Sequence, residues 1–215
     1  NMPEGQSAIY YIIGESRAAL MGSPHLEALK KKGYEVLLMT DPVDEWAVAG
    51  IPEIDDTPLV SALQANLELD DDEESKKERE EKEEKFSGLV EAFKTVLDDR
   101  VEHVRLSSRL TDSPVCLVIP EGGLSSHMER ILRSHDSDLA APKRILELNP
   151  DHVLVDRLDQ LRKKDPASEK LMDWVEMLYD QALLTEGSPL ADPNRFARRL
   201  TRLMEDASFA AVAGS

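Results

Sequence analysis

The chain has few of the features that mark secreted, membrane-spanning or metal-binding proteins. Its 215 residues include one cysteine, so neither a disulfide nor a thiolate metal site can form within the chain. Cys116 lies in the apolar run at 115–119, which predicts a buried strand. The sequence has no run of about 18 apolar residues and does not open on a basic segment followed by an apolar core. We therefore expect a cytoplasmic protein with neither a membrane span nor a signal peptide.

Basic residues are scarce relative to acidic ones. Lysine and arginine number 26 against 43 aspartates and glutamates, which gives a formal net charge of −17. A surface of this sign repels nucleic-acid phosphates and anionic membranes, so neither is expected as a partner. The 5 histidines show no pair at metal-ligand spacing on one helix, and no metal site is expected.

The N-terminal part has the pattern of a βαβ unit. Residues 9–13 and 36–39 predict strands, and the residues between Gly14 and Gly33 predict helix. Turn formers and an acidic stretch then place a domain boundary near residue 69. We expect a flexible start over residues 1–7 and an α/β subdomain over residues 8–69.

The second part reads as α+β, so the expected fold class is α/β plus α+β. Residues 70–98 predict one long helix, charged at first and amphipathic from Phe86 on, with acid-before-base pairs four residues apart on its charged part. A small three-stranded sheet flanked by helices follows, with strands at 101–106, 115–119 and 145–148. This domain is expected to span residues 70–208, with a disordered tail at 209–215.

Two helices end the domain, at 169–184 and from Pro193 on. The first carries apolar side chains well beyond one stripe about 100° wide, so it must be buried on two sides. The second has an apolar face of Phe196, Leu200, Leu203 and Met204, with Arg195, Arg198, Arg199 and Arg202 pointing away from it.

One candidate for catalysis lies on the first strand-to-helix turn. Gly14-Glu15-Ser16-Arg17-Ala18 nearly matches the nucleophile elbow of α/β-hydrolases. Ser16 also fits a helix N-cap, which we favour. A phosphate-binding loop and a Gly-rich dinucleotide turn are both missing from the sequence, so no nucleotide-binding motif is recognised.

A short apolar helix face is expected at 122–134. Leu124, Met128, Ile131 and Leu132 fall at i, i+4, i+7 and i+8. Such a face fits core packing. It also fits adaptable binding, because the flexible and polarisable Met128 side chain can repack against different partners.

Several segments, in order and at similar spacing, resemble the heat-shock-protein-90 chaperones, and their bacterial members above all. The first is 9–46, which contains Ser23-Pro24-His25-Leu26-Glu27 and ends on Asp44-Glu45-Trp46; the others are 109–114, 147–152, 180–184 and 192–196. The likeness covers about residues 4–204. It implies the end of a middle domain followed by a C-terminal dimerisation domain, cut from a longer protein.

The resemblance also implies sites. The last two helices would pair with those of a second copy in a four-helix bundle, so the chain would be a homodimer. Its interface would use Trp174, Leu178, Leu183, Phe196, Leu200 and Leu203. Non-native client proteins would bind at Glu45, Trp46, Leu124, Met128, Ile131 and Leu132, with Trp46 exposed beside a carboxylate, unless Trp46 only covers the core.

The implied function is that of the dimerisation and client-binding part of an ATP-dependent chaperone. ATP and Mg²⁺ would be bound by an N-terminal domain outside this chain, so we expect no cofactor, no catalytic residue and no enzymatic activity here. The end at 210–215 differs from the Met-Glu-Glu-Val-Asp tail of cytosolic eukaryotic relatives, so co-chaperones that need that tail are not expected. A small serine hydrolase using Ser16 and an acidic scaffold remain as alternatives.

Overall fold

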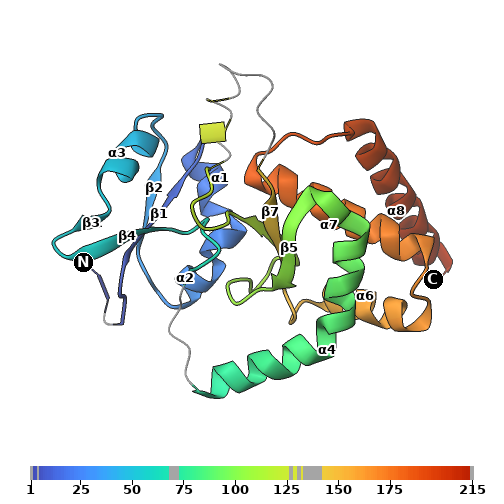
Figure 1. Ribbon diagram of the computed structural model, residues 1–215. Coiled ribbons are helices and arrows are strands. Elements are labelled where there is room, and N and C mark those ends of the chain that lie inside the picture. The colour runs from blue at the N-terminus through green and yellow to red at the C-terminus, as the bar shows by residue number, and fades with distance from the viewer. Residues whose placement is uncertain are drawn as a thin grey trace.

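A computed structural model describes residues 2–3, 5–67, 73–125, 128–129, 132 and 142–213. These residues form two units, each built on one sheet, and Figure 1 shows helices between the two sheets as well as on the outer side of the second. The expected boundary near residue 69 falls in a stretch outside the described residues, between the two sheets in sequence.

The first unit has a four-stranded sheet in the order β2-β1-β4-β3. Strand β1 (Ile9–Ile13) runs parallel to β2 (Val36–Met39) and to β4 (Thr57–Ser61), and β4 is antiparallel to β3 (Glu53–Ile54). The predicted βαβ unit is confirmed. The β3–β4 hairpin was not predicted, because its turn residues Asp55 and Asp56 adopt positive φ of 50° and 60° without the glycine that usually signals such a turn.

Short helices connect β1 to β2. They are α1 (Arg17–Met21), a 3₁₀ turn (Pro24–Leu26) and α2 (Glu27–Lys31). Leu20, Leu26 and Leu29 from these elements are buried against Tyr10 and Ile12 of β1. Figure 1 shows α1 and α2 between the two sheets, so they contribute to both units.

Within the start expected to be flexible, over residues 1–7, Gly5 and Gln6 make contacts with the first unit. The Tyr34 hydroxyl donates to the Gly5 carbonyl at 2.7 Å, and Gln6 is buried. The Gln6 side-chain amide also donates to the Ala8 carbonyl at 2.7 Å. These contacts place the first residues beside the first sheet.

The second unit has a three-stranded sheet in the order β5-β7-β6. Strand β7 (Arg144–Leu148) is parallel to β5 (Val101–Leu106) and antiparallel to β6 (Val115–Val118). All three predicted strands are confirmed, and Cys116 is buried in β6 as expected.

The long charged helix is confirmed as α4 (Glu73–Leu97). Phe86, Leu89, Phe93 and Leu97 are buried in the core of the second unit, whereas most of the preceding turns are exposed. Two lysines of the charged part form ion pairs at the start of α6 (Val153–Lys164). The sequence had predicted that they pair with glutamates of their own helix. The observed pairs are Lys82 with Asp151 at 2.8 Å and Lys85 with Asp156 at 3.0 Å.

The last two helices are α7 (Glu169–Glu186) and α8 (Pro193–Ala213). Ser168 is the N-cap residue of α7 but its side chain makes no capping hydrogen bond, while the Asp192 carboxylate accepts from the Arg195 N–H at 2.9 Å. Helix α8 continues to Ala213, so the expected disordered tail is helical over 209–213. Within the described part of the chain, no helix is long and apolar enough to cross a membrane.

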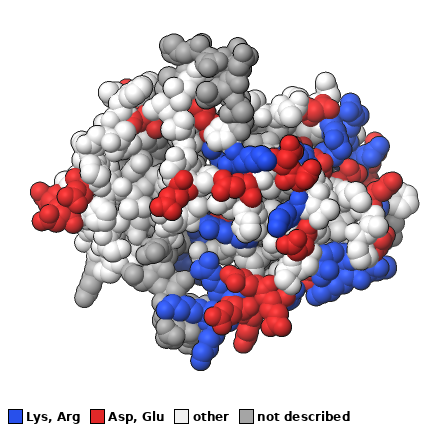
Figure 2. Space-filling view, in the orientation of Figure 1, with Lys and Arg blue, Asp and Glu red and all other residues white. Residues whose placement is uncertain are grey.

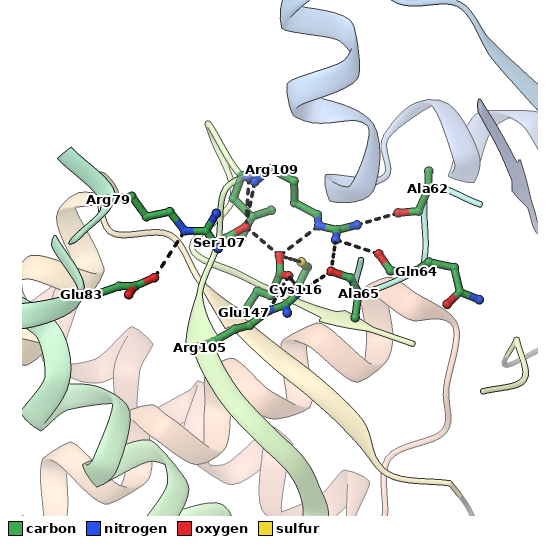
Figure 3. Close-up of polar contacts among 11 residues, drawn as sticks. Ala62, Gln64, Ala65, Arg79, Glu83, Arg105, Ser107, Arg109, Cys116 and Glu147 are labelled. Carbon is green, nitrogen blue, oxygen red and sulfur yellow. Dashed lines mark hydrogen bonds and ion pairs between the residues drawn. The ribbon is translucent and has the colours of Figure 1, made fainter. Parts of the chain in front are cut away.

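A buried cluster of polar groups joins the two units. Arg109, 2% exposed, donates to the Glu147 carboxylate at 3.0 Å and to the carbonyls of Ala62 and Gln64 at 2.8 Å each. Arg105 binds the other oxygen of Glu147 at 2.7 Å and also contacts the Ala65 carbonyl. Figure 3 shows the Arg109 and Arg105 side chains between the 62–65 segment and Glu147. We call Arg105, Arg109 and Glu147 the junction cluster.

Backbone contacts continue the junction on both sides of this cluster. The Ala65 N–H donates to the Ile119 carbonyl and the Ile119 N–H to the Leu63 carbonyl, both at 2.8 Å. The Glu27 carboxylate of α2 accepts from the N–H groups of Thr111 at 2.6 Å and Asp112 at 2.9 Å. Burial acts to raise the pKa of Glu27, but hydrogen bonds from Ser113 and these N–H groups outweigh it and lower the pKa.

We expect Arg109→Met to be strongly destabilising. The substitution removes one of the positive charges beside the buried Glu147 carboxylate and leaves two carbonyls without their hydrogen-bond donor. The free energy of unfolding should therefore fall by about 3–5 kcal/mol. Arg79→Met is the matched control, because it breaks the exposed Arg79–Glu83 pair (Figure 3) and should cost less than about 1 kcal/mol. Urea unfolding followed by circular dichroism measures both, and equal losses would contradict the assignment.

Acid should destabilise the junction through His25. Burial, and next the positive charge of Arg109, lower the pKa of His25 from 6.5 to about 3. Between these values the unfolded chain binds a proton that the folded chain does not, so stability is complete above pH 6.5 and falls as the pH is lowered toward 3. Lowering the pH from 7.5 to 5 should cost about 2 kcal/mol through this one group.

The measurement is urea unfolding at both pH values. His25→Gln should remove about 2 kcal/mol of the pH dependence, whereas His103→Gln, at an exposed position of β5, should leave it unchanged. An unchanged pH dependence in His25→Gln would show that other groups cause the acid sensitivity.

Candidate functional site

Helix α3 (Asp44–Gly50) follows β2 and carries the Asp-Glu-Trp sequence in its first turn. Acidic residues favour this position because the N-terminal end of a helix is partly positive. The Asp44 carboxylate also accepts from the Asp41 N–H at 2.9 Å, which fixes the turn that leads into the helix. Successive residues on a helix point in different directions, and here Trp46 is 60% exposed while Glu45 is buried.

The buried Glu45 corrects the sequence-based expectation of a carboxylate at the surface beside Trp46. Its carboxylate accepts from the Ser125 hydroxyl at 2.5 Å. The same hydroxyl oxygen accepts from the Met128 N–H at 3.0 Å, so Ser125 caps the start of the helical turn that contains Met128. Two segments 80 positions apart, each assigned separately to client binding, are thus joined by one serine.

A cavity of about 190 Å³ lies where these segments meet. Its polar walls come from the first sheet and α3, and include Tyr11, Ser61 and Glu45. Its apolar walls include Leu124 and Met128. We call it the α3 cleft.

Tyr11 remains protonated at neutral pH in this cleft. Burial, and to a smaller degree the negative charge of Glu45, raise the pKa of Tyr11, while a hydrogen bond with Ser61 acts in the opposite direction. The cleft therefore offers hydroxyl groups and one buried carboxylate beneath an apolar rim, which is a combination that fits a peptide carrying an apolar side chain.

The rim of the α3 cleft has an exposed apolar surface. Of the residues that line the cleft, Leu124 is 40% exposed and Met128 is half-buried. Leu132 does not line the cleft and is 38% exposed, and Ile131 lies outside the described residues. Further exposed apolar residues of the first unit are Leu37, Val43, Ile51 and Ile54. In the orientation of Figure 2, the visible side of the first unit has few charged side chains apart from an acidic group at its outer edge, whereas the visible side of the second unit has many.

The residues assigned to a dimer interface fall into two groups. Leu178 of α7 is 2% exposed and belongs to the core of its own chain, which removes it from any contact surface; Trp174 and Leu183 are partly buried against the same core. On α8, Phe196 and Leu203 are half-buried and Leu200 is 40% exposed. The most exposed apolar residues lie further along α8: Met204 at 64%, Phe209 at 77% and Val212 at 80%.

One arginine of α8 is buried against α7, contrary to the expectation that all four arginines point away from the apolar face. Arg199 is 6% exposed and pairs with Asp173 at 3.1 Å, Glu176 at 3.5 Å and Asp180 at 3.8 Å. Glu176 also binds Arg100 at 2.7 Å. Phe196 and Leu203 lie three residues before and four residues after Arg199, on the same side of α8, and are half-buried, whereas Leu200 and Met204 remain exposed.

The catalytic alternative gains no support from the position of Ser16. Its hydroxyl oxygen accepts from the Ala19 N–H at 3.3 Å, as a helix N-cap does. His25 is buried, and His152 accepts from the Leu154 N–H at 3.1 Å as the N-cap of α6. Among the described residues, no group of three His, Cys, Asp or Glu side chains could hold a metal ion.

Ser125, Tyr11 and Ser61 were not predicted to belong to the site. A serine before a helical apolar pattern is a recognised N-cap signal, so the capping role of Ser125 could have been found. Its bond to Glu45, and the approach of Tyr11 and Ser61 to Met128, depend on how the two units pack. Nothing local in the sequence signals them.

Comparisons with known proteins agree along nearly the whole chain. The family described as "Hsp90 protein" matches residues 1–211. The Chaperone protein HtpG of Myxococcus xanthus (strain DK1622) is 54% identical over 214 residues, covering 99% of this chain and 33% of that protein. The protein of the same name from Geobacter sulfurreducens is 52% identical over 206 residues, 94% of this chain and 32% of its own length.

A third relative, the Chaperone protein HtpG of Mycolicibacterium vanbaalenii, is 47% identical over 212 residues, covering 95% of this chain and 33% of its own. The chain thus spans about a third of the length of the curated relatives it matches. The family match and these identities agree with the motifs that first pointed to this family. The chain belongs to the Hsp90 family, of the bacterial HtpG type.

Proposed function

We propose that this chain is the client-binding and dimerisation part of a cytoplasmic molecular chaperone. The observation that carries the proposal is the α3 cleft, where Ser125 joins α3, which carries the exposed Trp46, to Met128. We call the described residues 124–125 and 128–129 the Met128 segment. The relatives are named as chaperones, and an exposed apolar rim over polar groups is suited to partly unfolded chains of varied sequence.

The proposed client site works by burial of apolar surface. A non-native chain exposes apolar side chains that a folded protein would bury, and Trp46, Leu124 and Leu132 offer exposed area for them. Met128 adds adaptability, since its side chain can repack. ATP and Mg²⁺ are assigned to the part of the longer relatives that this chain does not match, so no step in this chain involves them.

The proposed dimer uses the exposed stripe of α8. Leu200 and Met204 lie one turn apart on the same side of the helix and are both exposed, so these two side chains form the proposed contact. Pairing with the same helix of a second copy would bury these side chains by a two-fold, self-complementary contact. This assignment shifts the interface from Leu178 to Leu200 and Met204 of α8.

Trp46→Ala should weaken binding of a non-native chain about tenfold, because an aromatic residue at the centre of an interface typically contributes more than 1 kcal/mol. The probe is reduced and carboxymethylated lactalbumin, which cannot refold, and fluorescence anisotropy measures its affinity. Unfolding free energy should change by no more than about 0.5 kcal/mol, as expected for an exposed position.

The matched control for this prediction is Val153→Ala. Val153 is also 60% exposed but lies at the start of α6, away from the α3 cleft. If both substitutions weaken probe binding equally, the probe binds exposed apolar surface without preference for the α3 cleft. If Trp46→Ala does not weaken probe binding, the client site is rejected.

The double substitution Leu200→Glu and Met204→Glu should raise the dimer dissociation constant at least tenfold, because it places charges in an apolar contact at a cost above about 1.4 kcal/mol. Sedimentation equilibrium measures the dissociation constant. Thr201→Glu, exposed on the same helix, is the control and should have a smaller effect. A chain that is monomeric before any substitution would reject the dimer.

A further inference from the structure

The Met128 segment is held at two points by contacts to different parts of the fold. At its start, Ser125 donates to Glu45 of α3 at 2.5 Å. One residue past Met128, the Glu129 carboxylate forms an ion pair with the guanidinium of Arg144, the first residue of β7. The segment therefore contacts the first unit through a hydroxyl and the second through a charge.

Arg144 connects this ion pair to the end of α7. Its guanidinium is buried, with the side chain 6% exposed, and its Nε donates to the Glu186 carboxylate at 2.7 Å. Glu186 is the last residue of α7, and its other oxygen accepts from the Ser188 hydroxyl at 2.9 Å. Arg144 is thus linked through Glu186 to Ser188, which lies in the connection between α7 and α8.

The chemistry of the group suits a bridge between two carboxylates. A guanidinium is planar and offers donors on several edges, so it can bind one carboxylate through Nε and another through Nη2 without changing its own position. The Glu129 and Glu186 side chains are 13% and 5% exposed. Pulling either away would leave a charge poorly paired in a dry environment, which is costly, so the two glutamates are expected to keep their relative position.

We propose that Arg144 is a positioning residue that couples client binding at the Met128 segment to pairing of the α7–α8 helices with a second copy. A client that shifts the segment at Met128 displaces Glu129, and Arg144 transmits the displacement to Glu186 and to the start of α8. By linkage, dimerisation then changes client affinity by the same factor as client binding changes dimer affinity. The inference rests on the proposed function, because it requires both the client site and the dimer.

The test measures the dimer dissociation constant by sedimentation equilibrium, with and without saturating reduced and carboxymethylated lactalbumin. In the unsubstituted chain the probe should change this constant at least about fivefold, the lower range of allosteric couplings. Glu129→Gln keeps the size of the side chain and the Arg144–Glu186 pair but removes the charge that Arg144 binds. It should reduce the change to less than about twofold while both affinities stay measurable.

Two further variants separate coupling from stability. Arg144→Lys keeps the charge but loses the separate Nε and Nη2 donors, so it should also reduce the coupling. Glu91→Gln breaks the exposed Glu91–Lys94 pair of α4 and should leave the coupling unchanged. A fivefold change that persists in Glu129→Gln, or a dimer and client that bind without affecting each other before substitution, would overturn the inference. Absence of the dimer or of client binding altogether would instead reject the proposed function.

Discussion

The buried ion pair between Arg109 and Glu147 is the interaction on which the arrangement of the two units depends. Both side chains are 2% exposed, and other N–H groups of Arg109 donate to carbonyls of the 62–65 segment at the end of the first unit. A charge pair in this environment is tolerated only because nearly every donor and acceptor has a partner. The requirement for complete pairing fixes the relative position of the two sheets, which apolar contacts alone would specify less sharply.

The α3 cleft follows from that fixed position. Its walls come from β1, β4 and α3 on one side and from Ile119, residues 123–125 and Met128 on the other, so a small rotation of one unit would open it. The Ser125–Glu45 hydrogen bond at 2.5 Å requires the same alignment.

Ion pairs between arginine and glutamate also hold α7 in the second unit. Arg100 and Arg199 both bind Glu176 in the middle of α7, and Arg144 binds Glu186 at its end. Burial alone would raise the pKa of Glu176, but the hydrogen bond and charge of Arg100 and the charge of Arg199 outweigh it and lower that pKa. The carboxylate is therefore negatively charged beside the two arginines. These ion pairs join α7 and α8, while Leu200 and Met204 of α8 remain exposed.

The sequence by itself determined the family, the strands of both sheets except the β3–β4 hairpin, and the long helix that changes from solvated to buried at Phe86. Those features rest on local periodicity and on contiguous motifs, which a chain carries whatever its packing. Only the tertiary structure decided that Glu45 is buried, that Leu178 is core, and that Arg199 faces α7. Each of these depends on a partner tens of positions away, such as Ser125 for Glu45. Periodicity shows which side of a helix is apolar. Whether that side is buried in the core of its own chain depends on which other elements pack against it, and the local sequence does not specify them.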